Sequence, residues 1–556
     1  MNTNDEKIKI TFPDGKIIEV EKETYVSDLV QNFKENAEDI LAVKMNNKIY
    51  TLDQKIKYNA KIQPVLVNTK EGAAVYRRSL SLLLSAAAHK KFPKARLVIG
   101  HSLGYGYYYT LENGSKISEK DIHEIEEEMK KMVQENLPIE TDTISYEEAV
   151  ELFEKMDLVK TRKQLNYIAP PRITINRIGE YSELYFGPMV LSTGVLKTFA
   201  LKPYGEGFLL RFPDSTYEHA ALPEFKDEPK LFEVYSKYKE WGRKIGVTAA
   251  SDLNELITKR KVNDFIDICE TFQQKNFSKI ASQIVEKGTV RVVLIAGPSS
   301  SGKTTSAKKL ALELQAMGYT PKVISLDCYY VDHSRTPLDE DGKPDYECLE
   351  ALDVELLNQN LVDLFAGKEV IIPEYDFHTG KPSFEEKNKM SLKEHEILVM
   401  EGIHGLNPKL TPKIPDELKF KIYLSALTQL NLDDHNRIPT SDNRLIRRIV
   451  RDYQFRGKSA AGTIAMWPSV QKGERLHIFP FQNNADAILN TALDYELSVL
   501  KVYAEPLLRC VNPTEPEYAE ACQLLQFLNN FATIAPTQVP VRSIIREFIG
   551  GSAFHY

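Results

Sequence analysis

The sequence is poor in the residues that build cross-linked or metal-bound proteins. Five cysteines occur among 556 residues, and none forms a C-x-x-C pair. Neither a disulfide framework nor a cysteine zinc site is therefore indicated. Long apolar runs are also lacking. The longest, LSLLLSAAA at 80–88, is about half of the roughly 20 residues that a membrane-spanning helix needs.

An excess of positive charge is lacking as well. The net charge is −7, so the whole chain has no general attraction to nucleic acid or to an anionic membrane, although a local basic patch stays open. The first residues, MNTNDEKIKITF, contain no apolar signal core. We therefore expect a cytoplasmic protein without a membrane partner. The length predicts roughly three or four domains.

The chain divides into an α+β front half and an α/β back half. Short strands and one helical stretch (27–36) predict a small α+β unit. An apolar helix over 76–90, a strand over 99–111 and an acidic helix over 118–136, beginning at Ser118, indicate a second α+β unit. The predicted segments are 1–67, 68–222, a helical connector over 223–286, an α/β unit over 287–510 and a helical extension over 511–556.

From residue 291 the pattern becomes β-α-β. Apolar runs such as RVVLIAG, KVISLD, EVIIPEYDF, EILVMEG and FKIYLSA alternate with helices predicted over 303–316 and 351–366. Continuous apolar strands between helices predict a mostly parallel sheet that is buried on both faces. Ligands of such sheets lie at the carboxyl ends of the strands, so residues there receive the functional interpretation.

The segment GPSSSGKTT at 297–305 fits the phosphate-binding pattern G-x-x-x-x-G-K-[S/T]. In this loop backbone N–H groups surround the nucleotide phosphates, the lysine reaches the β- and γ-phosphates, and the hydroxyl after it holds Mg²⁺. A serine-rich surface turn would not explain a Lys-Thr pair that opens a helix. The predicted ATP-binding residues are Gly297, Ser299, Ser300, Ser301, Gly302, Lys303, Thr304 and Thr305.

Two carboxylates end neighbouring predicted strands, Asp327 in SLDCYY and Glu401 in LVMEG. Such a residue is often simply the first residue of a loop. Transfer of a phosphoryl group to an alcohol, however, needs a carboxylate at the hydroxyl and carboxylates that organise Mg²⁺. We assign Asp327 as the base and Glu401, with Thr304, as the Mg²⁺ site. The two carboxylates could exchange roles, which would make Asp327 a metal ligand.

Arginines recur at helical spacing in NRLIRRIVRD. Arg444, Arg447, Arg448 and Arg451 share one stripe, with apolar residues on the opposite side. A solvated charged face would normally mix lysine and glutamate with arginine, whereas an all-arginine stripe suits bidentate contact with phosphate oxygens. We expect this helix to close over the site as a lid.

Together these motifs resemble the uridine kinase/phosphoribulokinase family over about 287–510. The resemblance is carried by GPSSSGKT, SLDCYY, PEYDF at 373–377, the MEG ending at 402 and NRLIRRIVRD with RG following. It implies ATP and Mg²⁺ as cofactors, Asp327 as the base for a ribose 5′-hydroxyl, and Tyr375 in the nucleoside pocket. It also implies that Arg444 and Arg447 belong to the phosphate and substrate clamp. The predicted catalytic residues are therefore Asp327, Lys303, Arg444 and Arg447.

Two departures from that family concern the acceptor. The segment that usually holds the ribose reads YECLEALD (346–353), with Glu347 at its first acid, and Gly380 stands where a pyrimidine-contacting histidine is usual, while His378 lies nearby out of register. The leading acceptor is a pyrimidine ribonucleoside. Another hydroxyl compound, such as pantothenate or a sugar phosphate, stays open, as does GTP as donor. The predicted acceptor-side residues are Tyr329, Tyr330, Glu347, Tyr375, His378 and Arg448.

The front half resembles other proteins. Residues 1–67 are similar to a TGS domain, and 68–222 are similar to the editing domain of threonyl-tRNA synthetase. The four positions that carry the His and Cys ligands of that editing site are Arg78, Leu82, Tyr185 and Met189 here, so editing activity is not expected. The scaffold could bind RNA, bind a regulatory ligand or assemble homo-oligomers. An ATP-regulated RNA-binding protein is therefore the second hypothesis. In GYGYYY (104–109) we favour core packing over base stacking.

Overall fold

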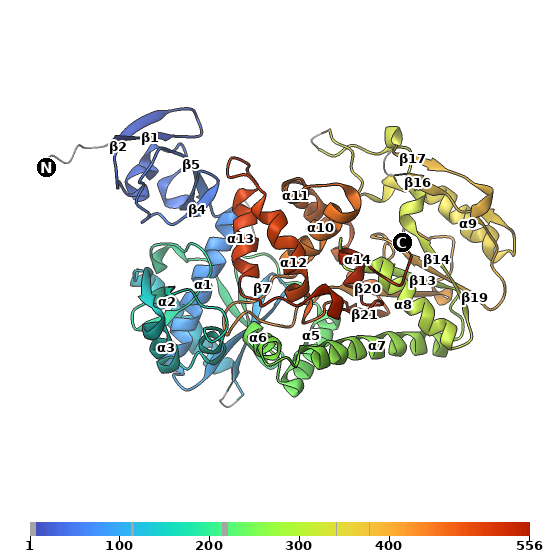
Figure 1. The fold of residues 1–556 in the computed structure, drawn as a ribbon, viewed down its shortest axis with the longest axis horizontal. Coiled ribbons are helices and arrows are strands. Elements are labelled where there is room, and N and C mark those ends of the chain that lie inside the picture. Colours follow the sequence, from blue (N-terminus) through green and yellow to red (C-terminus); the bar gives the residue numbers. More distant parts are fainter. Residues whose placement is uncertain (1–6, 113–115, 214–220, 341, 377–378, 556) are drawn as a thin grey trace.

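The structure is a computed structural model, and it describes residues 7–112, 116–213, 221–340, 342–376 and 379–555. Figure 1 shows the N-terminal unit at the upper left and the second unit below it. The α/β unit lies on the right, and the C-terminal helices lie between the two sides. Across the described ranges, no helix is both long enough and apolar enough to span a bilayer.

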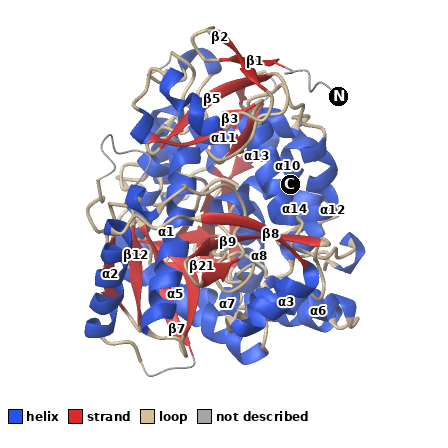
Figure 2. Ribbon diagram, turned by 90° about the vertical axis from the view of Figure 1, so that its left-hand side faces the viewer, coloured by secondary structure: helices blue, strands red, loops and turns tan. Residues whose placement is uncertain are grey.

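The N-terminal unit is a small mixed sheet with strand order β2-β1-β5-β3-β4, and it lies at the top of Figure 2. Ile10, Val26 and Val43 are fully buried in its core. The helical stretch predicted over 27–36 is a 3₁₀ helix that is shorter than expected. The elements are β1 (Lys7–Thr11), β2 (Ile17–Glu21), η1 (Val26–Asn32), η2 (Ala37–Asp39), β3 (Ile40–Met45), β4 (Lys48–Tyr50) and β5 (Ala60–Leu66).

The second unit packs the long helix α1 against the sheet β11-β12-β7-β6. The expected helix over 118–136 is confirmed as α2, with a capping box between Ser118 and Asp121. The strand predicted over 99–111 is instead the hairpin β6–β7, which turns at Gly104 and Tyr105, both at positive φ. The elements are α1 (Lys70–Lys91), β6 (Arg96–Leu103), β7 (Gly106–Glu112), α2 (Glu119–Gln134), β8 (Glu140–Ser145), α3 (Tyr146–Lys155), α4 (Val159–Gln164), β9 (Arg172–Ile178), β10 (Tyr181–Glu183), η3 (Thr193–Val195), β11 (Ala200–Tyr204) and β12 (Gly207–Arg211).

Three helices connect the two halves. They are α5 (Pro229–Ile245), α6 (Ala250–Thr258) and α7 (Val262–Lys287). Helix α7 runs along the lower edge of the molecule toward the α/β unit (Figure 1). Side chains of α7 share one hydrophobic core with the main sheet and with the C-terminal helices. Helix α7 and the C-terminal helices therefore pack as parts of the α/β unit, whereas Leu231 and Tyr235 of α5 pack mainly with side chains of the front half.

The α/β unit is built on a parallel sheet with strand order β14-β19-β13-β20-β21, as the apolar runs predict. Its elements are β13 (Val292–Ala296), α8 (Lys303–Ala316), β14 (Thr320–Ser325), η4 (Leu326–Tyr329), η5 (His333–Arg335), η6 (Leu349–Ala351), α9 (Val354–Phe365), β15 (Val370–Ile371), β16 (Glu374–Asp376), β17 (Lys381–Ser383), η7 (Glu386–Asn388), β18 (Lys389–Met390), β19 (Glu396–Glu401), η8 (Asp416–Leu418), β20 (Lys419–Ser425), α10 (Thr440–Arg456), α11 (Ala460–His477), η9 (Phe479–Asn484), β21 (Ala487–Asn490), α12 (Glu496–Arg509), α13 (Tyr518–Leu528), η10 (Pro536–Gln538) and α14 (Arg546–Ile549).

The central strand shows why the sheet is apolar throughout. Val293 and Ile295 of β13 join the core beneath α8 and α10, whereas Val292 and Leu294 join the core beneath α9 on the other face. Burying each such side chain contributes about 1.5–3 kcal/mol, which fixes the strand in the centre. The run EVIIPEYDF is different. It forms β15 and β16, which pair in small antiparallel ribbons outside the main sheet.

The two halves meet at the loop 426–439 between β20 and α10. Asn431 donates a hydrogen bond to the Ile99 carbonyl at 2.7 Å, and the Ile99 N–H donates to the Asp434 carbonyl at 3.1 Å. His435 is buried and contacts Glu183 of β10 through Nδ1 at 2.6 Å. This loop therefore ties the front half to the helix that carries the arginine stripe.

Candidate active site

The carboxyl ends of β13, β14 and β19 lie side by side. Glu401 at the end of β19 is in register with Ile295 of β13 on one side and Ser325 of β14 on the other. The loop 297–302 follows β13 and leads into α8, and Asp327 follows β14 within η4. The structure thus brings the phosphate-binding loop and both predicted carboxylates to one edge of the sheet.

Two positions of the loop have no room for a side chain and therefore require glycine. A Cβ on Gly297 would lie 2.6 Å from the Leu424 carbonyl oxygen. Gly302 has φ of +82°, and a Cβ there would lie 2.7 Å from Ile544. Ser300 also adopts a positive φ of +58°. The turn therefore depends on a left-handed conformation that glycine adopts at the lowest cost.

Lys303 and Thr304 open α8 as the motif predicts. The Lys303 ammonium donates to the carbonyls of Gly297 at 3.1 Å and Pro298 at 3.3 Å, so it lies along its own loop. The Thr304 hydroxyl donates to the Glu401 carboxylate at 3.1 Å. Oxygen donors of this kind are the ligands that Mg²⁺ prefers.

The electrostatics of the two carboxylates also fit a cation. Burial, together with the negative charge of Asp327, raises the pKa of Glu401 to about 7. Burial likewise raises the pKa of Asp327, while Lys303, Arg456 and Arg451 act in the opposite direction. The negative charge of Asp327 therefore opposes ionisation of Glu401. A divalent cation bound beside the Thr304 hydroxyl would stabilise the ionised form of both carboxyl groups.

The arginine helix α10 is a core element, and the lid prediction is wrong for this structure. Leu445, Ile446, Ile449 and Val450 on its apolar side are fully buried, and the helix packs against α11, α12 and α14. Arg444 and Arg447 on the other side are 4% and 0% exposed. Because both faces are covered, the helix cannot swing over the site without exposing this core.

The arginines hold the loop in place. Arg444 donates to the Ser299 carbonyl at 3.1 Å and Arg447 to the Ser300 carbonyl at 3.2 Å, while Arg448 donates to the Ser299 hydroxyl at 2.6 Å. Their charges are compensated by buried carboxylates, which are Glu474 for Arg444, Glu496 for Arg447 and Asp452 for Arg448. In this arrangement Arg444 and Arg447 stabilise the loop backbone.

Two carboxylates that sequence reasoning missed contact backbone N–H groups of the phosphate-binding segment. Glu474 of α11 accepts from the Ser299 N–H at 3.0 Å. Glu547 of α14 accepts from the Thr305 N–H at 3.0 Å and from its hydroxyl at 2.7 Å. Both glutamates lie far from the motif in the chain, and no sequence pattern marks them.

Aromatic side chains gather beside Asp327. The Tyr330 ring lies 5.5 Å from that of Tyr375 and 6.2 Å from that of Tyr346, measured between centroids. Tyr329 faces the opposite way. Its side chain is 2% exposed in the core, and its hydroxyl accepts a hydrogen bond from Asn360 at 3.1 Å. Tyr329 is therefore a core residue here, unlike the acceptor-side role predicted for it.

Glu347 is placed on the same side of the site. Its side chain packs against Gly473 of α11. Burial raises the pKa of its carboxyl to about 7, and the positive charge of Arg448 acts against this rise. His378, the remaining predicted acceptor-side residue, lies outside the described residues. The acceptor side therefore combines Tyr330, Tyr375 and the half-buried carboxyl group of Glu347.

The positions of the editing-like site form a filled core. Leu82, Tyr185 and Met189 are buried, and Arg78 donates to the Pro188 carbonyl at 2.6 Å. Among the described residues, no group of three or more His, Cys, Asp or Glu side chains could hold a metal ion. In the neighbouring sheet Tyr108 and Tyr109 are buried, which agrees with the core interpretation for these two tyrosines, whereas Tyr105 at the hairpin turn is exposed.

Comparisons with known proteins find different relatives for the N-terminal part and for the α/β unit. Residues 292–498 match the sequence model described as "Phosphoribulokinase / Uridine kinase family". A threonine–tRNA ligase from Desulforamulus reducens is 34% identical over 196 residues, which are 35% of this chain and 31% of that enzyme. The similarity to these ligases lies in the N-terminal part. One from Streptococcus pyogenes serotype M5 is 36% identical over 35% of this chain and 30% of its own length.

The chain thus spans less than a third of the length of these ligases. Among solved structures, one titled "Structure of a Possible Uridine Kinase from Bacillus stearothermophilus" is 20% identical. It covers 41% of this chain and 100% of its own, with a TM-score of 0.25.

Proposed function

We propose that this protein is an ATP-dependent kinase that transfers a phosphoryl group to a hydroxyl of a small molecule. The observation that carries the proposal is the meeting of Lys303, Asp327 and the Thr304–Glu401 pair at one edge of the parallel sheet. Phosphoryl transfer depends mainly on positioning and on stabilisation of charge. These side chains supply a cation, a base and a metal site at that edge.

Each side chain has a distinct role. Lys303, now on the loop carbonyls, turns toward the β- and γ-phosphates when ATP is bound. Thr304 and Glu401 would hold Mg²⁺, which neutralises charge on the phosphate oxygens. Asp327 accepts the proton of the attacking hydroxyl, and the charges of Lys303 and Arg451 help to keep it ionised.

The leading acceptor is a pyrimidine ribonucleoside that is phosphorylated at its ribose 5′-hydroxyl. Tyr330 and Tyr375 offer aromatic walls for a planar base. The carboxyl of Glu347 is a candidate partner for the vicinal ribose hydroxyls. A substrate that lacks the 2′-hydroxyl would leave the half-buried Glu347 carboxyl group without this partner, which predicts a preference for ribonucleosides.

Glu547 must leave its position when ATP binds. Backbone N–H groups at the start of α8 are donors for the nucleotide phosphates. In this structure the Thr305 N–H donates to Glu547. A phosphate oxygen and a carboxylate oxygen cannot share that N–H, and their negative charges repel each other. We therefore interpret the structure as a closed, nucleotide-free state, in which the Glu547 carboxylate occupies part of the phosphate-binding site.

The decisive experiment is a screen for acceptor-dependent release of ADP from Mg-ATP. The panel contains uridine, cytidine, adenosine, guanosine, their 2′-deoxy forms, pantothenate and sugar phosphates, and the products are identified by mass. A product from pantothenate or a sugar phosphate alone would refute the nucleoside acceptor and keep the kinase. Binding of ATP without any product, with RNA affinity that changes with ATP, would favour the regulatory RNA-binding hypothesis instead.

A further inference from the structure

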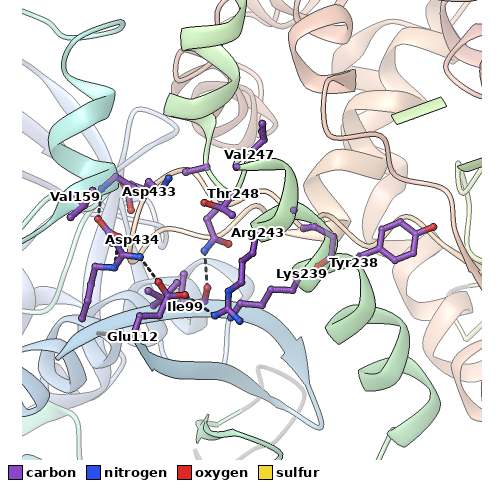
Figure 3. A pocket seen from close by; sticks show the side chains of 18 of the residues that line it. Ile99, Glu112, Val159, Tyr238, Lys239, Arg243, Val247, Thr248, Asp433 and Asp434 are labelled. Carbon is purple, nitrogen blue, oxygen red and sulfur yellow. Dashed lines mark hydrogen bonds and ion pairs between the residues drawn. The ribbon is translucent and has the colours of Figure 1, made fainter. Parts of the chain in front are cut away.

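A cavity of about 300 Å³ lies between helix α5, the sheet of the front half and the loop 426–439 (Figure 3). Residues of the phosphate-binding loop do not line it. Ligand pockets in proteins commonly measure about 300–1,000 Å³. The cavity therefore has the size for a small ligand that binds outside the nucleotide site.

The exposed charge of this cavity is mainly positive. Lys239 and Arg243 extend from α5 toward the sheet that carries Glu112 (Figure 3). The two acids of the loop, Asp433 and Asp434, are 3% and 1% exposed, and their carboxylates accept hydrogen bonds from backbone N–H groups. They therefore add little acidic surface to the cavity.

Most of the cations that line the cavity have a carboxylate partner. Arg96 and Arg243 both pair with Glu112. The Lys160 ammonium pairs with Asp252 at 2.8 Å. One carboxylate thus serves two arginines, and another, outside the lining, serves the lysine.

Lys239 is the exception among the described residues. Its ammonium donates to the Thr110 hydroxyl at 3.2 Å and lies 5.7 and 5.8 Å from the ring centroids of Tyr108 and Tyr235. In the described ranges it has no carboxylate within ion-pair distance. Burial, with the nearby charge of Arg243, lowers the pKa of Lys239 to about 8. A buried charge without a counter-ion is costly, so an anion bound beside this ammonium would stabilise it.

The cavity also supplies a second donor and an apolar surface. Arg243 is exposed and uses Nη2 for Glu112, and its other N–H groups have no partner in the part of the chain that the structure describes. Val159 lines the cavity with an exposed apolar side chain. A ligand there can receive hydrogen bonds from two cationic side chains and place an apolar part against the valine.

We propose that this cavity binds a small organic acid with one carboxylate, held by Lys239 and Arg243, and with a short apolar body toward Val159. A single negative charge fits because one lining cation lacks a carboxylate partner. A dicarboxylate or a phosphate would bring a second negative charge close to Glu112, and a nucleotide would bring more. This proposal does not depend on the kinase activity.

The test uses the full chain with acetate, propionate, butyrate, lactate, pyruvate and benzoate, first by thermal shift and then by calorimetry. We expect at least one of these carboxylates to bind with a Kd in the micromolar to millimolar range. The corresponding amide should bind at least about 10-fold more weakly, because it has a similar shape without the charge. Failure of every carboxylate to bind, or equal binding of the amide, would refute the proposal.

Two variants connect the binding to the cavity. Lys239→Met should weaken it about 10- to 100-fold, the range expected for loss of a hydrogen bond to a charged group. Val159→Trp should weaken it roughly 10-fold or more, because a larger side chain at this exposed position fills the cavity. The matched control is Lys244→Met, because Lys244 lies on the same helix, is exposed and pairs with Glu240.

Proton uptake on binding identifies the ammonium itself. The titratable groups around Lys239 are Arg243 and Tyr235 of its own helix and Tyr108 and Glu112 of β7. A bound carboxylate favours the protonated amine, so binding at about pH 9 should take up protons, measured by calorimetry in buffers of different ionisation enthalpy. The uptake should be absent in Lys239→Met.

Unchanged affinity in Lys239→Met and Val159→Trp would place the site elsewhere and overturn the assignment. Should Lys239→Met prove unstable, Val159→Trp decides alone. Inorganic phosphate that binds more tightly than every carboxylate, and is lost in Val159→Trp, would overturn the organic acid as the ligand class.

Discussion

Substitution of Glu547 provides a direct test of the closed state. Its Oε2 accepts two hydrogen bonds from Thr305, at 3.0 and 2.7 Å. Hydrogen bonds to charged groups contribute about 1.5–3 kcal/mol, against about 0.5–1.5 kcal/mol for neutral ones. Glu547→Gln keeps an accepting oxygen but removes the charge. The contact should therefore weaken by about 1–2 kcal/mol, which is roughly 5- to 30-fold in an equilibrium constant.

Because ATP must replace this contact, its apparent Kd should fall by the same factor in Glu547→Gln. Calorimetry with a non-hydrolysable ATP analogue and Mg²⁺ measures this value directly. Glu505→Gln is the matched control, since Glu505 forms an exposed ion pair with Arg509 on α12. A Kd that is unchanged or higher in Glu547→Gln, with the melting temperature preserved, would show that Glu547 does not compete with the nucleotide.

Four further outcomes are expected. Lys303→Ala should abolish turnover while the circular dichroism spectrum stays unchanged, and Asp327→Asn should lower kcat about 10²- to 10⁴-fold with ATP affinity near normal. Near-wild-type turnover of the asparagine variant would remove Asp327 from the role of base. Glu347→Gln should reduce the preference for uridine over deoxyuridine, measured as the ratio of their kcat/KM values. An unchanged ratio would exclude a contact between Glu347 and the 2′-hydroxyl. Burial opposes the charge of His435, but Glu183 with Asp434 and Asp433 raises its pKa. A raised folded pKa contributes stability below about pH 6.5 that is lost as the pH rises through the folded value. Denaturant unfolding should therefore show stability falling as the pH rises above about 6.5, with a smaller fall in His435→Gln.

The local motifs could be predicted from the sequence because their structure depends on residues that are close together in the chain. The P-loop pattern predicted helix α8 over 303–316, and apolar runs without alternation predicted the parallel sheet. The capping box at Ser118 gave the start of α2. In these elements the turn, the cap and the buried faces are encoded by residues that are neighbours in the chain.

The distant residues that contact these motifs could not be predicted from the sequence. The arginine spacing was consistent with an exposed lid, and what makes α10 a core helix is the set of buried carboxylates that meet its arginines from α11 and α12. Glu547 reaches Thr305 across 242 residues, and the Glu183–His435 contact spans 252. Pairings at such separation depend on the whole fold, so a pattern within one segment cannot reveal them.

The contact between Glu183 and His435 has a consequence for engineering by recombination. The two side chains come from opposite halves, they are 0% and 4% exposed, and their polar atoms lie 2.6 Å apart. A chimera that joined this front half to the α/β half of another protein would bury Glu183 against a loop that was not selected to receive it. An uncompensated buried charge of this kind typically costs about 3–5 kcal/mol, which is a large part of the stability of a typical domain. The contact surfaces of the two halves therefore depend on each other. Exchange of the front half between homologues should succeed when the loop 426–439 is exchanged together with it.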